Sequence, residues 1–129
     1  MNDDVKQTSC ECAGAPTLIF ACSGAADVGH VAGLAARKLT AEGVGKMFCL
    51  AGIGGRVSGI MKTTEAAAKV LAIDGCPLNC VEHCLQQAGF TEFEHLQLAD
   101  LDMVKGKTAP SDTAVARVTN AAAKKLRMV

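Results

Sequence analysis

Short runs of apolar residues divide the chain into regularly repeating segments. Three of them, residues 17–22, 46–51 and 70–73, are almost continuously apolar and end at small or turn-forming residues. Runs of this length and composition are typical of strands that are buried on both faces of a parallel sheet. A fourth run, residues 93–99, alternates with polar residues and is typical of an edge strand. The pattern therefore predicts four strands.

Segments with apolar residues at helical spacing separate these runs. The first follows Asp27, which can cap a helix, and ends at Gly43. A short helix is predicted from Thr63 or Thr64 to Lys69, and the last covers residues 111–126, with Ser111 or Asp112 as its cap. The intervening G-I-G-G-R-V-S-G segment, residues 52–59, is predicted as a loop, because it matches neither phosphate-binding glycine motif.

Strand and helix alternate throughout, which indicates parallel βαβ units with right-handed crossovers. We expect an α/β fold, a small three-layer α/β/α sandwich with a mostly parallel four-stranded sheet in the order 2-1-3-4. In that order strands 1 and 3 are neighbours at the topological switch point, where ligands bind beyond the carboxyl ends of the strands. Residues 16–129 are predicted to form one domain, and residues 1–15 a flexible tail that carries Cys10 and Cys12.

Composition and charge exclude several classes of function. The 13 basic and 13 acidic residues of this 129-residue chain balance, which argues against a nucleic-acid or membrane-surface protein. No apolar run approaches the roughly 18 residues of a membrane span, and the polar, acidic start is not a secretory signal. Seven cysteines in such a chain indicate reduced thiols in the cytoplasm, where metal binding or redox chemistry is commoner than structural disulfides.

The stretch D-G-C-P-L-N-C, residues 74–80, carries the strongest chemical signal. Pro77 suits the first position of a helix, which would place Cys76 at the N-cap and Cys80 one turn on, on the same face. The positive end of a helix lowers thiol pKa and favours the thiolate, which binds metals and attacks electrophiles. The stretch therefore predicts a soft-metal or redox site.

Four cysteines are expected at one end of the sheet: Cys22 after strand 1, Cys49 near the end of strand 2, and Cys76 and Cys80 after strand 3. Tetrathiolate coordination suits zinc, and also iron or cuprous copper. Strands 2 and 3 are two spacings apart, about 10 Å, so Cys49 must lean inward to join the others. If it cannot, Cys12 of the tail is the candidate fourth ligand.

The remaining candidates have simpler interpretations. Cys84 is predicted to be a buried small hydrophobe. His30 and His83 are predicted to be exposed, and His95, in the edge strand, to lie far from the cysteines. Asp74 is expected to fix the D-G-C turn by accepting backbone N–H groups, with an outer-shell or general-base role as the alternative.

Three motifs resemble the DGC-domain family, which is thought to bind zinc through four cysteines. They are F-A-C-S-G-A-A-D-V-G from Phe20, M-F-C-L-A-G-I-G-G from Met47 and L-A-I-D-G-C-P-L-N-C from Leu71. The resemblance covers roughly residues 18–98. Carried over by motif, it implies that Cys22, Cys49, Cys76 and Cys80 hold Zn²⁺, but it implies no physiological role.

The leading hypothesis is a cytoplasmic zinc-binding protein that acts in metal sensing, storage or transfer. The alternative is a thiol-dependent oxidoreductase or transferase with Cys76 as nucleophile and Cys22 or Cys80 as the resolving thiol. The spacing C-x-x-x-C differs from the C-x-x-C of thioredoxins, and six residues separate Cys49 from Arg56 where a phosphatase loop has five. Another soft metal or an iron–sulfur cluster is a third possibility.

Overall fold

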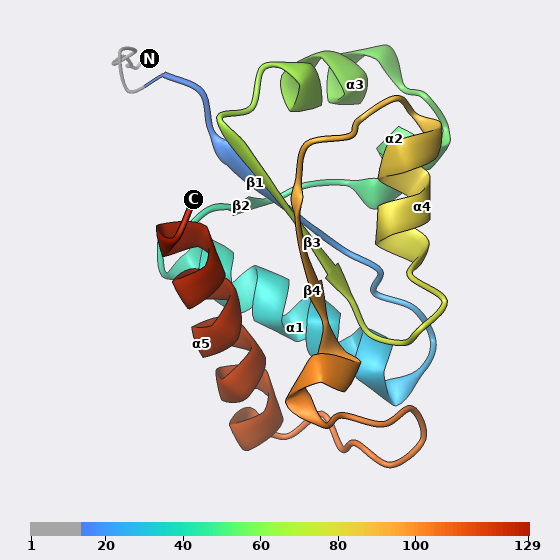
Figure 1. Ribbon diagram of the computed structural model, residues 1–129, viewed down its shortest axis with the longest axis vertical. Coiled ribbons are helices and arrows are strands. Elements are labelled where there is room, and N and C mark those ends of the chain that lie inside the picture. The colour runs from blue at the N-terminus through green and yellow to red at the C-terminus, as the bar shows by residue number, and fades with distance from the viewer. Residues whose placement is uncertain (1–13) are drawn as a thin grey trace.

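The computed structural model describes residues 14–129, which form one parallel four-stranded sheet flanked by helices on both faces (Figure 1). The strand order is β2-β1-β3-β4 and every pairing is parallel, which confirms the predicted α/β fold and strand order. The elements in chain order are β1 Thr17–Ala21, α1 Asp27–Ala41, β2 Lys46–Met47, α2 Leu50–Gly54, α3 Ser58–Glu65, β3 Lys69–Asp74, α4 Cys80–Gln87, β4 Glu94–Gln97, the 3₁₀ helix η3 Leu98–Leu101 and α5 Asp112–Arg127.

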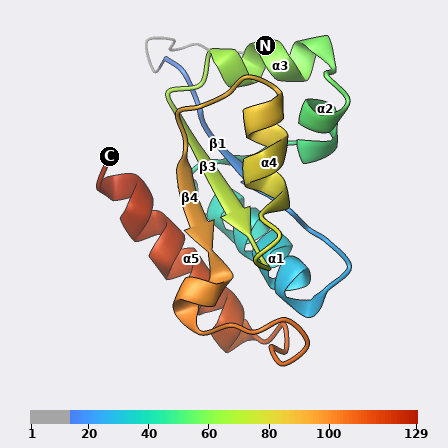
Figure 2. The same cartoon turned by 45° about the vertical axis from the view of Figure 1, so that its right-hand side comes forward.

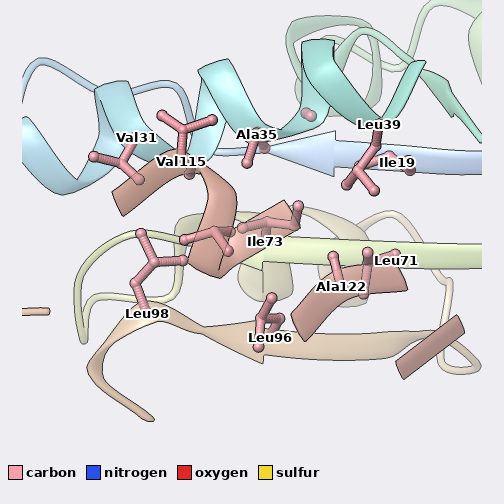
Figure 3. Close-up of a cluster of buried hydrophobic side chains, with 14 of the residues drawn as sticks. Ile19, Val31, Ala35, Leu39, Leu71, Ile73, Leu96, Leu98, Val115 and Ala122 are labelled. Carbon is pink, nitrogen blue, oxygen red and sulfur yellow. The ribbon is translucent and has the colours of Figure 1, made fainter. Parts of the chain in front are cut away.

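Helices α1 and α5 cover one face of the sheet, and α2, α3 and α4 cover the other (Figure 1, Figure 2). Each face has its own apolar core. Ile19, Leu71 and Ile73 pack toward α1 and α5 (Figure 3), whereas Leu18 and Phe20 pack toward the opposite helices. Both sets of alternating side chains on β1 and β3 are thus buried, which explains why these strands read as continuous apolar runs.

The second predicted strand is wrong in its extent. Only Lys46 and Met47 pair with β1, and Leu50–Gly54 forms helix α2. The chain turns into α2 because Gly52 packs directly on Ile60 of α3, where an added Cβ would lie 2.6 Å from Ile60 Cγ1. An apolar run of this length does not distinguish a strand from a short buried helix.

The predicted loop over residues 52–59 is also wrong, since it contains the end of α2 and the start of α3. Helix α3 covers Ser58–Glu65, so it overlaps only the first residues of the helix that was predicted from Thr63 or Thr64 to Lys69. Arg56 sits between the two helices with a left-handed φ of 56°. Its guanidinium donates to the carbonyls of Ile53 and Gly54 and, across the face, to Gln87 O. The Arg56 side chain thus satisfies the last carbonyls of α2, beside the C-cap residue Gly55, whose N–H donates to Ala51 O.

Within residues 14–129, no helix has both the length and the apolar character needed to cross a membrane.

Candidate metal centre

An open cavity of about 460 Å³ lies beyond the carboxyl ends of β1 and β3 and beside the first turn of α1. Figure 1 shows the connections after β1 and after β3 running side by side at this end of the sheet, next to the start of α1. This is the switch point at which the sequence predicts a ligand site. The cavity is lined by Cys22, Gly24, Ala25, Ala26, Val28, Gly29, Asp74, Cys76, Leu78, Cys80 and Lys105.

Three of the four predicted ligands, Cys22, Cys76 and Cys80, line this cavity. Cys22 follows β1, is half-buried and contacts both apolar cores, and its Sγ accepts the Gly75 N–H at 3.4 Å. Cys49 is exposed at the N-cap of α2 and is absent from the lining. In the described part of the chain, no group of three or more His, Cys, Asp or Glu side chains is spaced to hold a metal ion. Metal ligation by the four cysteines therefore stays a prediction.

Helix α4 begins at Cys80, so the prediction that Cys76 caps the helix is wrong. Cys76 to Asn79 form a β-turn in which Asn79 N donates to Cys76 O at 3.2 Å. Pro77 occupies the second position of this turn, which suits its fixed φ equally well. Asn79 is the N-cap with φ 54° and ψ 50°, a left-handed conformation that asparagine tolerates better than most residues. The turn, and not helical spacing, separates Cys76 from Cys80.

Asp74 closes the start of α4 from the end of β3. Its fully buried carboxylate accepts Val81 N at Oδ1, 2.8 Å away, and Glu82 N at Oδ2, 3.2 Å away. These donors belong to the second and third residues of the helix, whose N–H groups have no intrahelical partners. The prediction that Asp74 accepts backbone N–H groups is confirmed, but they belong to the helix and not to the D-G-C turn.

His95 lies beside the site, contrary to the prediction that it is distant. Its Nε2 is 2.8 Å from Asp74 Oδ2, and its Nδ1 is 3.8 Å from Glu82 Oε2. The register of β4 on β3, in which Ala72 pairs with His95 and Asp74 with Gln97, brings both β4 side chains to the D-G-C stretch. The predicted strand order already placed this strand next to β3, so that order was the available signal.

The pKa of the Cys80 thiol is raised. The largest cause is desolvation of the thiol, even though the residue as a whole is exposed. The negative charge of Asp74 is the second cause, and Cys76, Cys22 and Cys84 contribute less. The expectation that the helix N-terminus would lower this pKa is therefore wrong for Cys80. The physical reason is that desolvation of the thiol, and next the negative charge of Asp74 at the start of α4, both disfavour the thiolate.

Glycine backbones join the two cysteine-bearing connections. A Cβ on Gly75 would lie 2.6 Å from Val28 C and 2.7 Å from Gly29 N, and a Cβ on Gly29 would lie 2.7 Å from Gly24 N. Real Cβ atoms do not approach backbone this closely, so only glycine allows the D-G-C turn to rest on α1 and α1 to rest on the loop after Cys22. The glycine of the motif thus has a packing role.

A long connection between η3 and α5 completes the rim of the cavity with Lys105. The prediction that Asp27 caps the first helix is wrong, because Asp27 is the first residue of α1 and Ala26 is its N-cap. Asp27 instead holds this connection: its carboxylate accepts Gly106 N at 2.8 Å and Thr108 N at 2.9 Å, as well as Val28 N. The pKa of Asp27 is lowered, first because the Gly106 N–H donates to its carboxylate and second because the Thr108 N–H does so.

The other predicted candidates lie away from the cavity lining. His30 and His83 are exposed, as expected, and Cys84 is half-buried against the core beneath α4. Cys10 and Cys12 lie outside the described residues.

The fold and this cavity define an α/β protein with cysteines gathered at the switch point of a parallel sheet. A sequence model of the DGC domain matches residues 18–126, and the chain therefore belongs to the DGC domain family. It is also similar to the anaerobic and virulence modulator AnvM of Pseudomonas aeruginosa, with 35% identity over 88 residues, 68% of this chain and 67% of that protein. No solved structure matches the chain.

Proposed function

We propose that this protein is a cytoplasmic zinc-binding protein that acts in metal sensing, storage or transfer. Cys22, Cys76 and Cys80 would hold the metal at the cavity, with Cys49 as the fourth ligand. The observation that carries the proposal is that three thiols, from the ends of two neighbouring strands and the start of one helix, line a single cavity. Thiolates are soft donors and suit zinc or a similar soft metal.

Zinc binding requires the thiols to move closer together, because the described residues contain no ready-spaced ligand group. Cys49 has the furthest to move, because it is absent from the cavity lining, and its side chain is exposed. Its strand pairs with β1 at only two positions, and no side chain caps the helix that follows it. Because Phe48 and Leu50 on either side pack in the core, Cys49 would reach the metal through a local shift at its own exposed position.

The fold does not depend on the metal. The two apolar cores bury Ile19, Leu71 and Ile73 on one face and Leu18 and Phe20 on the other. We therefore expect the metal-free protein to keep its secondary structure. A structural zinc, by contrast, supplies the folding free energy of its domain, and chelation unfolds such a domain.

The test is elemental analysis of anaerobically purified protein beside a Cys76→Ser/Cys80→Ser double variant. We expect about one zinc per chain in the natural sequence, as for a mononuclear tetrathiolate site, and its loss in the double variant. Cys84→Ala is the matched control, since this cysteine lies on the same helix but packs into the core; it should retain the metal. Absence of metal from the natural sequence would contradict the proposal, and visible absorption would indicate an iron–sulfur cluster instead.

A second candidate function is a thiol-dependent oxidoreductase or transferase with Cys76 as nucleophile. The size of the cavity favours it, because 460 Å³ is much more than a single ion occupies and leaves room for a small organic molecule. Fast alkylation of Cys76 alone in metal-free protein near neutral pH would support this candidate. Slow and uniform alkylation of all the thiols would count against it.

A further inference from the structure

Two polar side chains of the edge strand, His95 and Gln97, reach across to the segment that carries Cys76 and Cys80. They lie two residues apart on β4, so both point to the same face of the sheet. Both are half-buried, and neither belongs to the proposed ligand set. Their polar atoms are directed at the end of β3 and at the turn before α4.

Gln97 holds the β-turn between the two cysteines. Its Nε2 donates to Cys76 O at 2.9 Å and to the Asn79 side-chain oxygen. Cys76 O and Asn79 are the first and last positions of the turn, and Asn79 N donates to the same Cys76 carbonyl. One side-chain amide thus fixes both ends of the turn. The other end of the amide, Oε1, accepts Ala99 N at 3.1 Å and starts the 3₁₀ helix η3.

His95 acts one step further along, on the start of α4. Its Nε2 contacts Asp74 Oδ2, the same oxygen that accepts Glu82 N, while Asp74 Oδ1 accepts Val81 N. Val81 and Glu82 directly follow Cys80, so the orientation of the carboxylate fixes where the first residue of the helix lies. Asp74 has no contact with solvent, and a partner that fixes its rotamer therefore fixes the helix start as well.

We propose that Gln97 and His95 are positioning residues that set the separation and orientation of the Cys76 and Cys80 thiols before any metal or substrate arrives. The proposal rests on the proposed function only where metal affinity is the readout. Holding the turn in advance lowers the ordering cost of binding, because the left-handed Asn79 and the turn backbone are already fixed. Side chains that support a site in this way typically change metal affinity by roughly 10–100-fold when they are altered.

The experiment uses Gln97→Glu in the full chain. A glutamate keeps an oxygen for Ala99 N, loses both donors to Cys76 O and Asn79, and adds a negative charge at that position. His95→Ala removes the contact with Asp74, and His95→Gln supplies an amide donor in its place as the conservative rescue. Glu94→Gln is the matched control, because this side chain of β4 points to the opposite face of the sheet.

Three quantities are measured for each protein: the zinc dissociation constant by competition with a chromophoric chelator, the ratio of iodoacetamide alkylation rates at Cys76 and Cys80 in metal-free protein, and the urea midpoint. We expect Gln97→Glu and His95→Ala to weaken zinc binding by about 10-fold or more and to change the alkylation ratio severalfold. His95→Gln should recover most of both, and Glu94→Gln should change neither.

A purely structural role would lower the urea midpoint and leave the zinc affinity and the alkylation ratio as they are; that result overturns the proposal. If the natural sequence takes up no zinc, the proposed function fails, and the alkylation ratio alone decides. A changed ratio in Gln97→Glu then still supports positioning of the thiols, and an unchanged ratio overturns it.

Discussion

The connection from β3 to α4 and the connection from β2 to α2 both carry proposed ligands, yet they are built differently. The first leaves a six-residue strand that pairs on both sides, rests Gly75 on the backbone of α1, and is closed by Asp74 and Gln97. The second leaves a two-residue strand and enters a five-residue helix with the exposed Cys49 as its uncapped start. The first connection is fixed by backbone packing and side-chain hydrogen bonds, whereas the second is fixed mainly by the packing of Phe48 and Leu50 in the core on either side of the exposed Cys49.

This difference suggests an order of events at the site. On the proposed function, a metal ion would first meet Cys22, Cys76 and Cys80, which line one cavity. Cys49 would join afterwards through a local shift at its own position. The sharpest tests change one connection at a time and compare the effects.

The largest effect is expected from Gly75→Ala. An added Cβ would lie within 2.7 Å of backbone atoms of Val28 and Gly29, which cannot rotate away as a side chain can. We expect a loss of about 3 kcal/mol in the free energy of unfolding, at the upper end of overpacking costs, measured by urea denaturation. Gly59→Ala in α3 is the control, since nothing lies within 4 Å of its Cβ position, and it should be neutral or slightly stabilising. Equal effects of the two changes would refute the packing role of the motif glycine.

A smaller loss is expected from Asp74→Ala. The change leaves the Val81 and Glu82 amides without their carboxylate, and a buried donor without a partner costs about 1–3 kcal/mol. Hydrogen exchange should show faster exchange at these two amides, while those in the middle of α1 keep their protection. Unchanged exchange at the start of α4 would mean that other groups close the helix.

The two connections are compared most directly by Cys22→Ser and Cys49→Ser. If Cys22 belongs to the existing framework and Cys49 joins last, Cys22→Ser should weaken zinc binding at least tenfold more than Cys49→Ser, in keeping with the factors of roughly 10–100 seen around metal sites. Chelator competition gives both constants, and circular dichroism checks that each variant is folded. Equal losses would mean that the four cysteines act as one preformed set.

The smallest effect is expected at Asp27, whose carboxylate holds the connection between η3 and α5. Its pKa in the folded protein lies below the ordinary value of 3.8, chiefly because the Gly106 N–H donates to its carboxylate. A depressed pKa stabilises the fold above the unfolded pKa, and this contribution disappears as the pH falls through the folded pKa. The difference in unfolding free energy between the natural sequence and Asp27→Asn should therefore be constant near neutrality and shrink below about pH 4. A difference that is independent of pH would contradict this.

Hydrophobic patterning was sufficient to predict the parallel sheet and its strand order, because the apolar runs on β1 and β3 have a single simple explanation. It failed at residues 50–59, where a short buried helix and a strand have the same apolar pattern. It also failed at the start of α4, because the carboxylate that closes this helix comes from Asp74, six residues before the helix begins. The prediction for His95 was wrong and Gln97 was not predicted, since the role of both depends on the register of β4 against β3. Whether the cysteines bind zinc remains a prediction from the sequence and the family.

The close packing of the Gly24, Gly29 and Gly75 backbones has a consequence for ligand access to the cavity. Because the backbones of these segments pack directly on each other, no side chain lies between them that could change rotamer. The opposite rim is formed by the exposed Leu78 and by Lys105, on segments that reach out from the body of the fold. Any ion or small molecule that binds in the cavity would therefore meet side chains that can change rotamer at Leu78 and Lys105, and fixed backbone at the glycines.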